Sequence, residues 1–174
     1  MANAFATHSV GESLVAYLKN AYAAQQEITQ PFDFRLISSG ELADSAAPAA
    51  NALTLFLYGI AQNGEPRTPV APGGRSVANP PLAIELHFIL TAWADDARME
   101  QTVLTWAMRE IQMHPVLDST SLSSEGGWAA SDAVQIVPAE LSLDEMSRVW
   151  NLLSPRYRLS VGYVARVVRV DTRA

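Results

Sequence analysis

The chain has 174 residues, of which 49% are hydrophobic and 17% are charged, so it can bury a core, and general disorder is excluded. It has no cysteine, which excludes disulfides and thiolate chemistry and makes a zinc site unexpected. It begins without a basic or apolar signal region, and it has no run of ~20 apolar residues for a membrane helix. We therefore expect a single domain over residues 1–174, in a soluble cytoplasmic protein.

The net charge of −6 is unevenly distributed along the chain. The last 19 residues contain five arginines and one aspartate, a net +4, so the preceding 155 residues carry −10. An acidic body disfavours general binding to nucleic acid. The basic end is suited to an acidic protein partner, or it is a strand with solvated arginines.

In the N-terminal half, the sequence predicts a helix and two strands. Ser9 and Glu12 form a capping box, and apolar residues then recur at helical spacing, which predicts a helix over 10–24. Residues 32–37 alternate between apolar and polar side chains, as a short strand does. Residues 51–61 are apolar on both faces and predict a central strand.

The segments on either side of this central strand are predicted to be irregular. Residues 41–50 are rich in Ala, Asp, Ser and Pro, which indicates a loop or a turn of poor helix. Residues 62–80 contain four prolines and three glycines and are long for a connection inside a domain. We expect them to form a surface loop that becomes ordered against a partner.

Residues 81–117 predict a strand, an acidic turn and a helix. One strand face is apolar, with Leu82, Ile84, Leu86, Phe88 and Leu90. The other face carries Glu85, His87 and Thr91. Asp95 or Asp96 caps the helix, which ends at His114 because the residue before a proline avoids the helical region. Its predicted core residues are Val103, Leu104, Ala107, Met108 and Ile111.

The C-terminal part begins with a second flexible loop, residues 118–131, which contains Trp128, and continues with a short strand at 133–137. Ser142 and Glu145 then form a capping box.

Leu141 and Met146 form a hydrophobic staple around this second capping box, and the helix should reach about residue 153. The last strand, 157–170, alternates between an apolar and an arginine-bearing face. Its apolar face holds Tyr157, Leu159, Val161, Tyr163, Ala165 and Val167.

Together these elements predict an α/β (α+β) sandwich. It has a mixed, mostly antiparallel sheet of about five strands with three helices packed on it.

Few residues form patterns associated with catalysis or metal binding. Glu85 and His87 lie at strand spacing on one face, which allows a metal site or an acid/base pair, or else a solvent-facing histidine. The acidic clusters near Asp95 and Asp144 lie at helix starts, where acids are stabilising. Residues 73–76 are glycine-rich but lack a Walker lysine. No catalytic, cofactor or metal residue is therefore assigned.

Aromatic and basic side chains are the candidates for an interface. Trp106 and Trp150 lie on predicted helices and are expected in the core. Trp128 is expected to anchor an interface, because an exposed aromatic in a loop tends to become buried on binding. The candidate interface residues are Trp128, Arg156, Arg158, Arg166, Arg169, Arg67 and Arg75.

Several phrases in this order resemble the cap, or tail-terminator, family of extracellular contractile injection systems. They are SVGESLVAYLKNAY, LTLFLYGI, PPLAIELHFILTAW, MHPVL and VWNLLSPRYRLSVGYVARVV, and the resemblance covers roughly residues 9–171. The resemblance implies a phage tail-terminator-like fold and a structural protein, not an enzyme. It also implies a hexameric ring at the distal end of the inner tube and sheath.

The implied partners are further copies of the chain, the inner tube protein and the sheath protein, with no cofactor, nucleic acid or membrane. The particle would be assembled in the cytoplasm and released extracellularly. One alternative is the terminator or completion protein of a true phage tail. Another is a small ligand-binding or enzymatic domain, which predicts a concave pocket lined by Glu85, His87 and Arg166.

Overall fold

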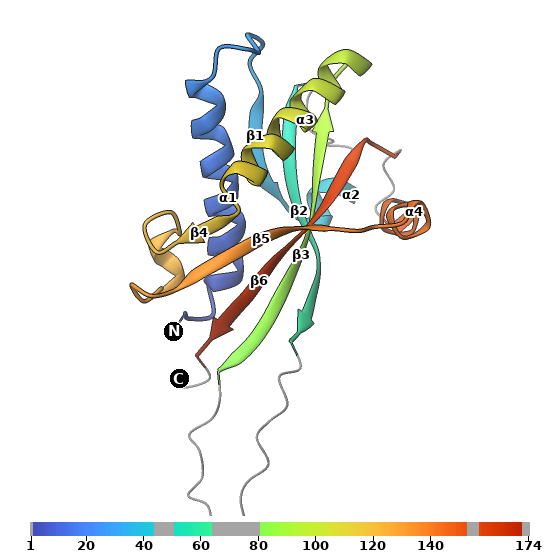
Figure 1. The fold of residues 1–174 in the computed structure, drawn as a ribbon. Helices are drawn as coiled ribbons and strands as arrows, with labels where there is room; N and C mark the ends of the chain where they lie inside the picture. The colour runs from blue at the N-terminus through green and yellow to red at the C-terminus, as the bar shows by residue number, and fades with distance from the viewer. Residues whose placement is uncertain (1, 44–50, 64–80, 153–156, 172–174) are drawn as a thin grey trace, which may run out of the picture.

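The computed structural model describes residues 2–43, 51–63, 81–152 and 157–171 (Figure 1). Its elements in chain order are α1 (Ala6–Ala24), β1 (Asp33–Ile37), α2 (Ser39–Ala43), β2 (Ala52–Gln62), β3 (Leu82–Trp93), α3 (Ala97–Met113), β4 (Val116–Asp118), the 3-10 helix η1 (Ser124–Gly126), β5 (Ala133–Ala139), α4 (Leu143–Leu152) and β6 (Ser160–Val170).

One six-stranded sheet organises the described residues, with the strand order β1-β2-β3-β6-β5-β4. β1 is parallel to β2, and the other neighbouring strands are antiparallel. The predicted mixed, mostly antiparallel sheet is therefore confirmed, and β2 lies inside it as expected. The predicted counts of five strands and three helices were too low, because β4 and α2 have three and five residues, too few for a periodic pattern.

Two β-bulges in the long strands change the face of the sheet on which the following side chains lie. One lies in β2, where Leu57 pairs with Phe88 and Gly59 pairs with His87. The other lies in β6, where the register shifts between the pairs Ile84–Val168 and Leu86–Ala165. A bulge places two residues opposite one, so alternation breaks after Ala165. Val168 is buried as a result, although strict alternation placed it on the arginine face.

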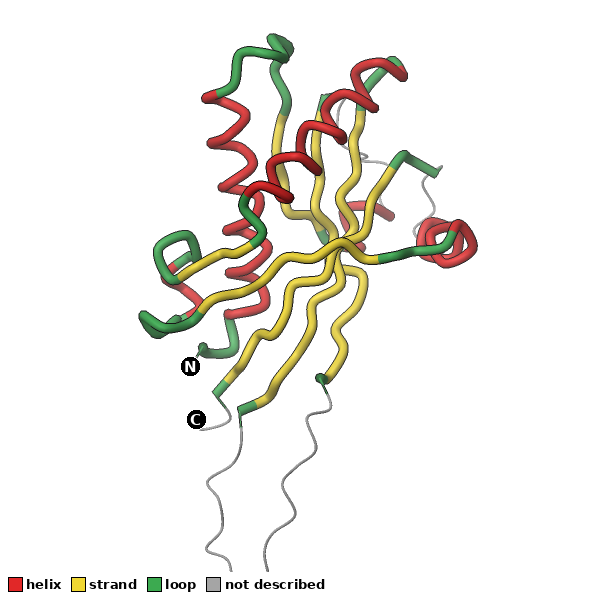
Figure 2. Tube along the Cα trace, in the orientation of Figure 1, coloured by secondary structure: helices red, strands yellow, loops and turns green. Residues whose placement is uncertain are grey.

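The main core lies between one face of the sheet and the pair α1 and α3 (Figure 2). The fully buried side chains of this core include Val10, Leu14, Leu18, Leu55, Leu86, Phe88, Leu90, Val103 and Ile111. Four of the five predicted core residues of α3 are buried, but Met108 is 42% exposed. Trp106 takes the inward position in that turn and is 4% exposed, as expected for a core tryptophan.

The opposite face of the sheet is covered only in part by helices. Leu42 of α2 and Met146 and Trp150 of α4 pack on Ile89 and Trp93 in a second, smaller cluster. In Figure 1, α4 lies beside one end of the sheet, and no described helix extends over the other end of that face. Among the residues that the structure describes, this asymmetry leaves part of the sheet without a covering helix.

Two of the three predicted helix N-caps are formed by the expected side chains. Asp96 caps α3, since its Oδ1 accepts from Met99 N at 2.8 Å, and His114 is the C-cap residue. Ser142 and Glu145 form the predicted capping box of α4, with Glu145 N donating to Ser142 Oγ at 3.2 Å. Their second contact runs from Ser142 N to Glu145 Oε2 at 2.9 Å.

The predicted capping box of α1 is wrong. The helix begins one turn earlier, at Ala6, and Ser9 is fully buried inside it. Asn3 orders the chain before the helix, because its carbonyl oxygen accepts from Ala6 N and its side chain accepts from Phe5 N. The Ser9 hydroxyl donates instead to the Ser123 carbonyl at 2.9 Å.

Candidate assembly surface

The uncovered part of the sheet forms a continuous band of side chains across four strands. Direct cross-strand pairs join Gly59 to His87, His87 to Val164, and Val164 to Val137, so these residues share one face. Two positions further along the strands, the same face carries Glu85, Arg166 and Gln135, and Gln135 pairs with Arg166. We call these residues the open face: Gly59, Glu85, His87, Gln135, Val137, Val164 and Arg166.

The open face combines half-buried apolar groups with exposed polar ones. Val137, Val164 and His87 are half-buried, whereas Arg166 is exposed. Asn63 donates to Glu85 Oε1 at 3.2 Å, and the Tyr58 and His87 rings meet at 5.9 Å. Burial, and then the charge of Glu145, raises the pKa of Tyr58 above its ordinary value. Apolar side chains beside a cation give this face the character of a protein interface.

The two described arginines of β6 extend from this surface. Arg169 lies opposite Ala83, three residues beyond Arg166, and both side chains are exposed. Within the described residues neither guanidinium has an ion pair, whereas Arg35 and Arg148 each contact an aspartate. Arg166 and Arg169 are therefore available to a partner's carboxylates.

Arg158, which precedes β6, has a different environment. Its guanidinium carbon lies 5.3 Å from the centroid of the Trp93 ring, a cation–π contact next to α4. Ser160 Oγ donates to its carbonyl oxygen at 2.9 Å. The predicted strand start at residue 157 was early, since β6 begins at Ser160. Arg67, Arg75 and Arg156 lie outside the described residues, as does most of the predicted 62–80 loop.

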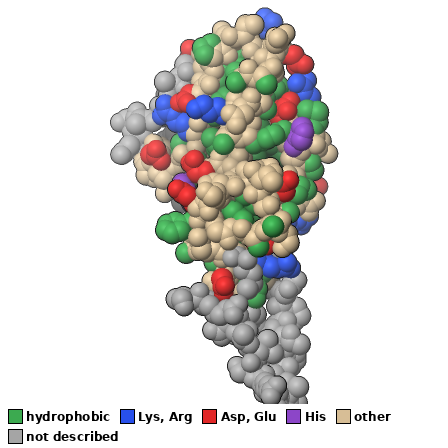
Figure 3. Space-filling model, turned by 90° about the vertical axis from the view of Figure 1, so that its left-hand side faces the viewer, with side chains coloured by type: hydrophobic (Ala, Val, Ile, Leu, Met, Phe, Trp, Pro, Cys, Tyr) green, Lys and Arg blue, Asp and Glu red, His purple; other side chains and the backbone are tan. Residues whose placement is uncertain are grey.

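Trp128 does not join these arginines. It packs against the main core beside α1, and its Nε1 donates to Ser9 Oγ at 2.9 Å. Ser13 Oγ accepts from Ser123 N at 2.7 Å, so the Trp128 loop is fixed to α1 at two points. Trp128 was expected to be exposed in a flexible loop, but it is partly buried against the core. Figure 3 shows the side of the molecule that carries α1, where acidic and basic side chains are interspersed.

Glu85, His87 and Arg166, which were predicted to line a concave pocket, do not line the cleft of about 540 Å³ that the structure contains. These three residues lie on the sheet face, while the cleft lies between α3 and the connection from α1 to β1. Among the described residues, no three His, Cys, Asp or Glu side chains gather as a metal site would require. No described helix is long and apolar enough to cross a membrane.

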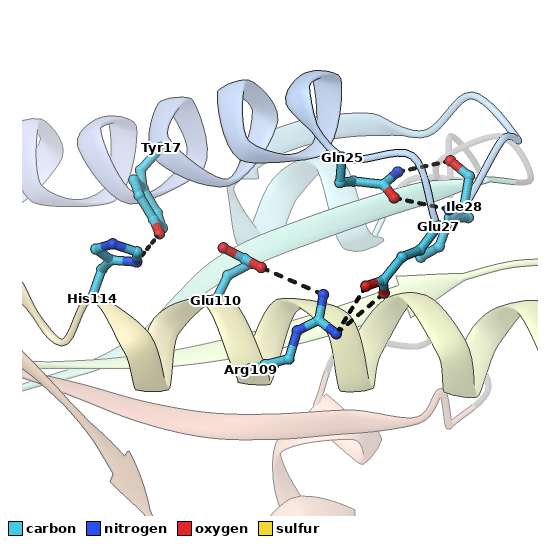
Figure 4. Close-up of polar contacts among 7 residues, drawn as sticks. All are labelled: Tyr17, Gln25, Glu27, Ile28, Arg109, Glu110 and His114. Atoms are coloured by element: carbon cyan, nitrogen blue, oxygen red, sulfur yellow. Dashed lines mark hydrogen bonds and ion pairs between the residues drawn. The ribbon is translucent and has the colours of Figure 1, made fainter.

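A polar network on the helical layer was missed in the sequence. Tyr17 Oη and His114 Nδ1 lie 2.6 Å apart across α1 and α3, and Arg109 bridges Glu27 and Glu110 (Figure 4). Burial, followed by the charge of Glu110, raises the pKa of Tyr17 above its ordinary value. The contacts of Tyr17 with His114 and of Glu27 with Arg109 join residues 97 and 82 positions apart, and such pairs leave no local sequence pattern.

The chain matches the model of the Pvc16 N-terminal domain family over residues 9–174. Its structure is similar to a PVC sheath/tube terminator of an extracellular contractile injection system in the extended state, with 21% identity and a TM-score of 0.52, covering 96% of this chain and 57% of that chain. It is also similar to the anti-feeding prophage tube-terminating cap, with 19% identity and a TM-score of 0.48, covering 95% and 54%. The chain therefore spans less than two thirds of both. No curated protein sequence matches it.

Proposed function

The chain belongs to the Pvc16 N-terminal domain family, and from this we propose that it terminates the tube and sheath of a phage-tail-like contractile injection particle. The family match over residues 9–174 carries the proposal. The fold shared with a PVC sheath/tube terminator supports it. The role is structural. To stop polymerisation, the chain must bind the last layer of tube and sheath subunits and present no binding surface to a further layer.

We propose that the chain acts as a closed ring of about six copies. Identical subunits that meet head to tail through different surfaces close into a ring when the rotation permits. The open face supplies one such surface, with two half-buried valines and Arg166, which has no ion pair in the described part of the chain. The acidic remainder of the chain supplies carboxylates for the facing subunit.

The proposed partners follow from this position in the particle. They are neighbouring copies, the inner tube protein and the sheath protein, and the role requires no cofactor, nucleic acid or membrane. The particle is assembled in the cytoplasm and acts after release. Trp128 is retained only as a secondary interface candidate, because its indole N–H already donates to Ser9.

Light scattering coupled to size exclusion tests the ring, and sedimentation with preformed inner tubes tests the binding of tube ends. The expected result is a species of about six copies, alone or on tubes, with binding that saturates at a few copies per tube. A chain that stays monomeric and does not sediment with tubes would overturn the proposal.

A further inference from the structure

A cleft of about 540 Å³ lies on the helical side of the molecule, away from the open face. Glu27 and Ile28, in the connection from α1 to β1, form one wall. The other wall comes from α3 and consists of Arg98, Gln101, Thr102, Thr105, Trp106 and Arg109. The exposure of the two threonines shows that the cleft is an open groove and not an enclosed cavity.

The α3 wall is a continuous polar stripe with a cation at each end. Residues 98, 101, 102, 105 and 109 recur at helical spacing and therefore lie along one face of α3. Arg98 and Arg109 are separated by about 16 Å along the axis, at about 1.5 Å per residue. The side chains between them are neutral hydrogen-bonding groups, and this stripe contains no acid.

One end of the groove already holds a carboxylate. Arg109 Nη1 lies 3.2 and 3.4 Å from the two carboxylate oxygens of Glu27 (Figure 4). Arg98, at the other end, has no ion pair within the described part of the chain. The contact between Glu27 and Arg109 therefore shows that an arginine of the groove binds a carboxylate. Arg98 is the position at which a second carboxylate can bind.

The floor of the groove is apolar and firmly held. Trp106 is 4% exposed and meets the rings of Tyr22 and Phe34 edge-on, with centroids 5.0 and 6.2 Å away. Ile28 is buried beside it. A rigid apolar floor between two cations favours a ligand that combines an acidic group with an aliphatic side chain.

We propose that this groove binds an extended acidic segment of a partner protein. About five extended residues, at ~3.3 Å each, span the distance between the two arginines. The segment places a carboxylate on Arg98, contacts the threonine hydroxyls along its length, and rests an aliphatic side chain on Trp106 and Ile28. The site is independent of the ring proposed above, since it lies on the other side of the sheet.

Amide chemical shifts of the whole chain, measured by NMR, test this proposal with a defined probe. The probe is the blocked peptide acetyl-Glu-Thr-Thr-Thr-Leu-amide, whose Glu and Leu lie on one face about 13 Å apart when extended, and its control has Gln in place of Glu. The Glu peptide should shift amides of Glu27, Ile28 and the α3 stripe, and the Gln peptide should bind about tenfold more weakly. Arg98→Gln should remove this difference, whereas Arg148→Gln, on α4, should preserve it.

Equal binding of both peptides, shifts confined to the open face, or no shifts would overturn the proposal. Concentration-dependent shifts of the groove amides without peptide would assign the groove to a second copy and also overturn it. Light scattering on the same samples reports ring formation separately. Failure of the groove and failure of the ring are thereby distinguished.

Discussion

The hydroxyl group of Ser9 connects two segments that are distant in sequence, α1 and the loop that contains Ser123 and Trp128. It lies in α1, accepts from Trp128 Nε1 and donates to the Ser123 carbonyl. Gly126 lies against the same contact, since a Cβ there would be 2.2 Å from Trp128 Nε1 and 2.9 Å from Ser9 Oγ. A buried hydrogen-bonding cluster of this kind tolerates little change in volume.

Gly126→Ala should destabilise the fold by about 1–3 kcal/mol, because the added methyl displaces the indole and the hydroxyl. The free energy of unfolding, measured in urea, checks this. Gly40→Ala is the matched control, since its added Cβ meets no atom closer than 3.8 Å and alanine suits the helix α2. Equal effects of the two substitutions would contradict the packing argument.

Trp128→Phe should cost about 1 kcal/mol through the lost indole donor, and Trp128→Ala about 2 kcal/mol or more through lost packing as well. Both values come from the same urea titration. Wild-type stability of Trp128→Ala would show that the loop does not depend on this contact and would restore the side chain to the interface.

Single residues with a local role were the ones that sequence reasoning predicted well. Asp96 and Ser142 cap helices by contacts within three residues, and both predictions are confirmed. Ser9 has the same local pattern but is engaged by residues 114 and 119 positions away. Tertiary contact therefore decided the role of its hydroxyl, and nothing within the helix indicated it.

Among the elements, the turn after β4 is built around one carboxylate. Asp118 Oδ1 accepts from the backbone N–H groups of Thr120 and Ser121 and from both hydroxyls. Chiefly because of these hydroxyl bonds, the pKa of Asp118 falls from 3.8 to about 2. The charged form is thus stabilised only in the folded state.

The sign of the pH dependence follows from that lowered pKa. The contribution of Asp118 is present above its unfolded pKa of 3.8 and is lost as the pH falls toward about 2. Asp118→Asn should therefore lower Tm at about pH 5, with the difference from wild type shrinking toward about pH 2. Thermal unfolding across this range checks it, and a constant difference would contradict it.

Long elements were predictable, and short or irregular ones were not. β3 and α3 show their periods over 12 and 17 residues. β4 has three residues and becomes a strand only because Leu117 pairs with Val134. The bulge in β6 depends on its pairing with β3, so the shift that buries Val168 was invisible in the strand alone. The candidate arginines could be named from the sequence. The open face around Arg166 could not, because it depends on the order of the strands in the sheet.

For the molecule as a whole, the main core and the proposed assembly surface lie on different faces of the sheet. α1 and α3 cover one face of the sheet completely enough to form the main core, while α4 covers only one end of the other. The end without a described helix carries Arg166 and Arg169, which have no ion pair within the described residues, on a chain with a net charge of −6. This arrangement favours contact between unlike surfaces of neighbouring copies.

Arg166→Glu should weaken association of the chain about tenfold or more at low salt, and the effect should shrink at about 1 M salt, where charges are screened. Sedimentation at several salt concentrations measures this. Arg148→Glu, the same charge change on α4, is the control. Arg158→Glu is less suitable, because it also removes the contact with Trp93. Equal effects of Arg166→Glu and Arg148→Glu would contradict a role for the open face.

Electron microscopy of particles made with and without its gene shows whether the chain terminates a contractile injection particle. Particles that lack the chain should have uncapped ends and tubes of uncontrolled length, and restoring the gene should restore a uniform length. Particles of unchanged length with fully capped ends in the deletion strain would contradict it.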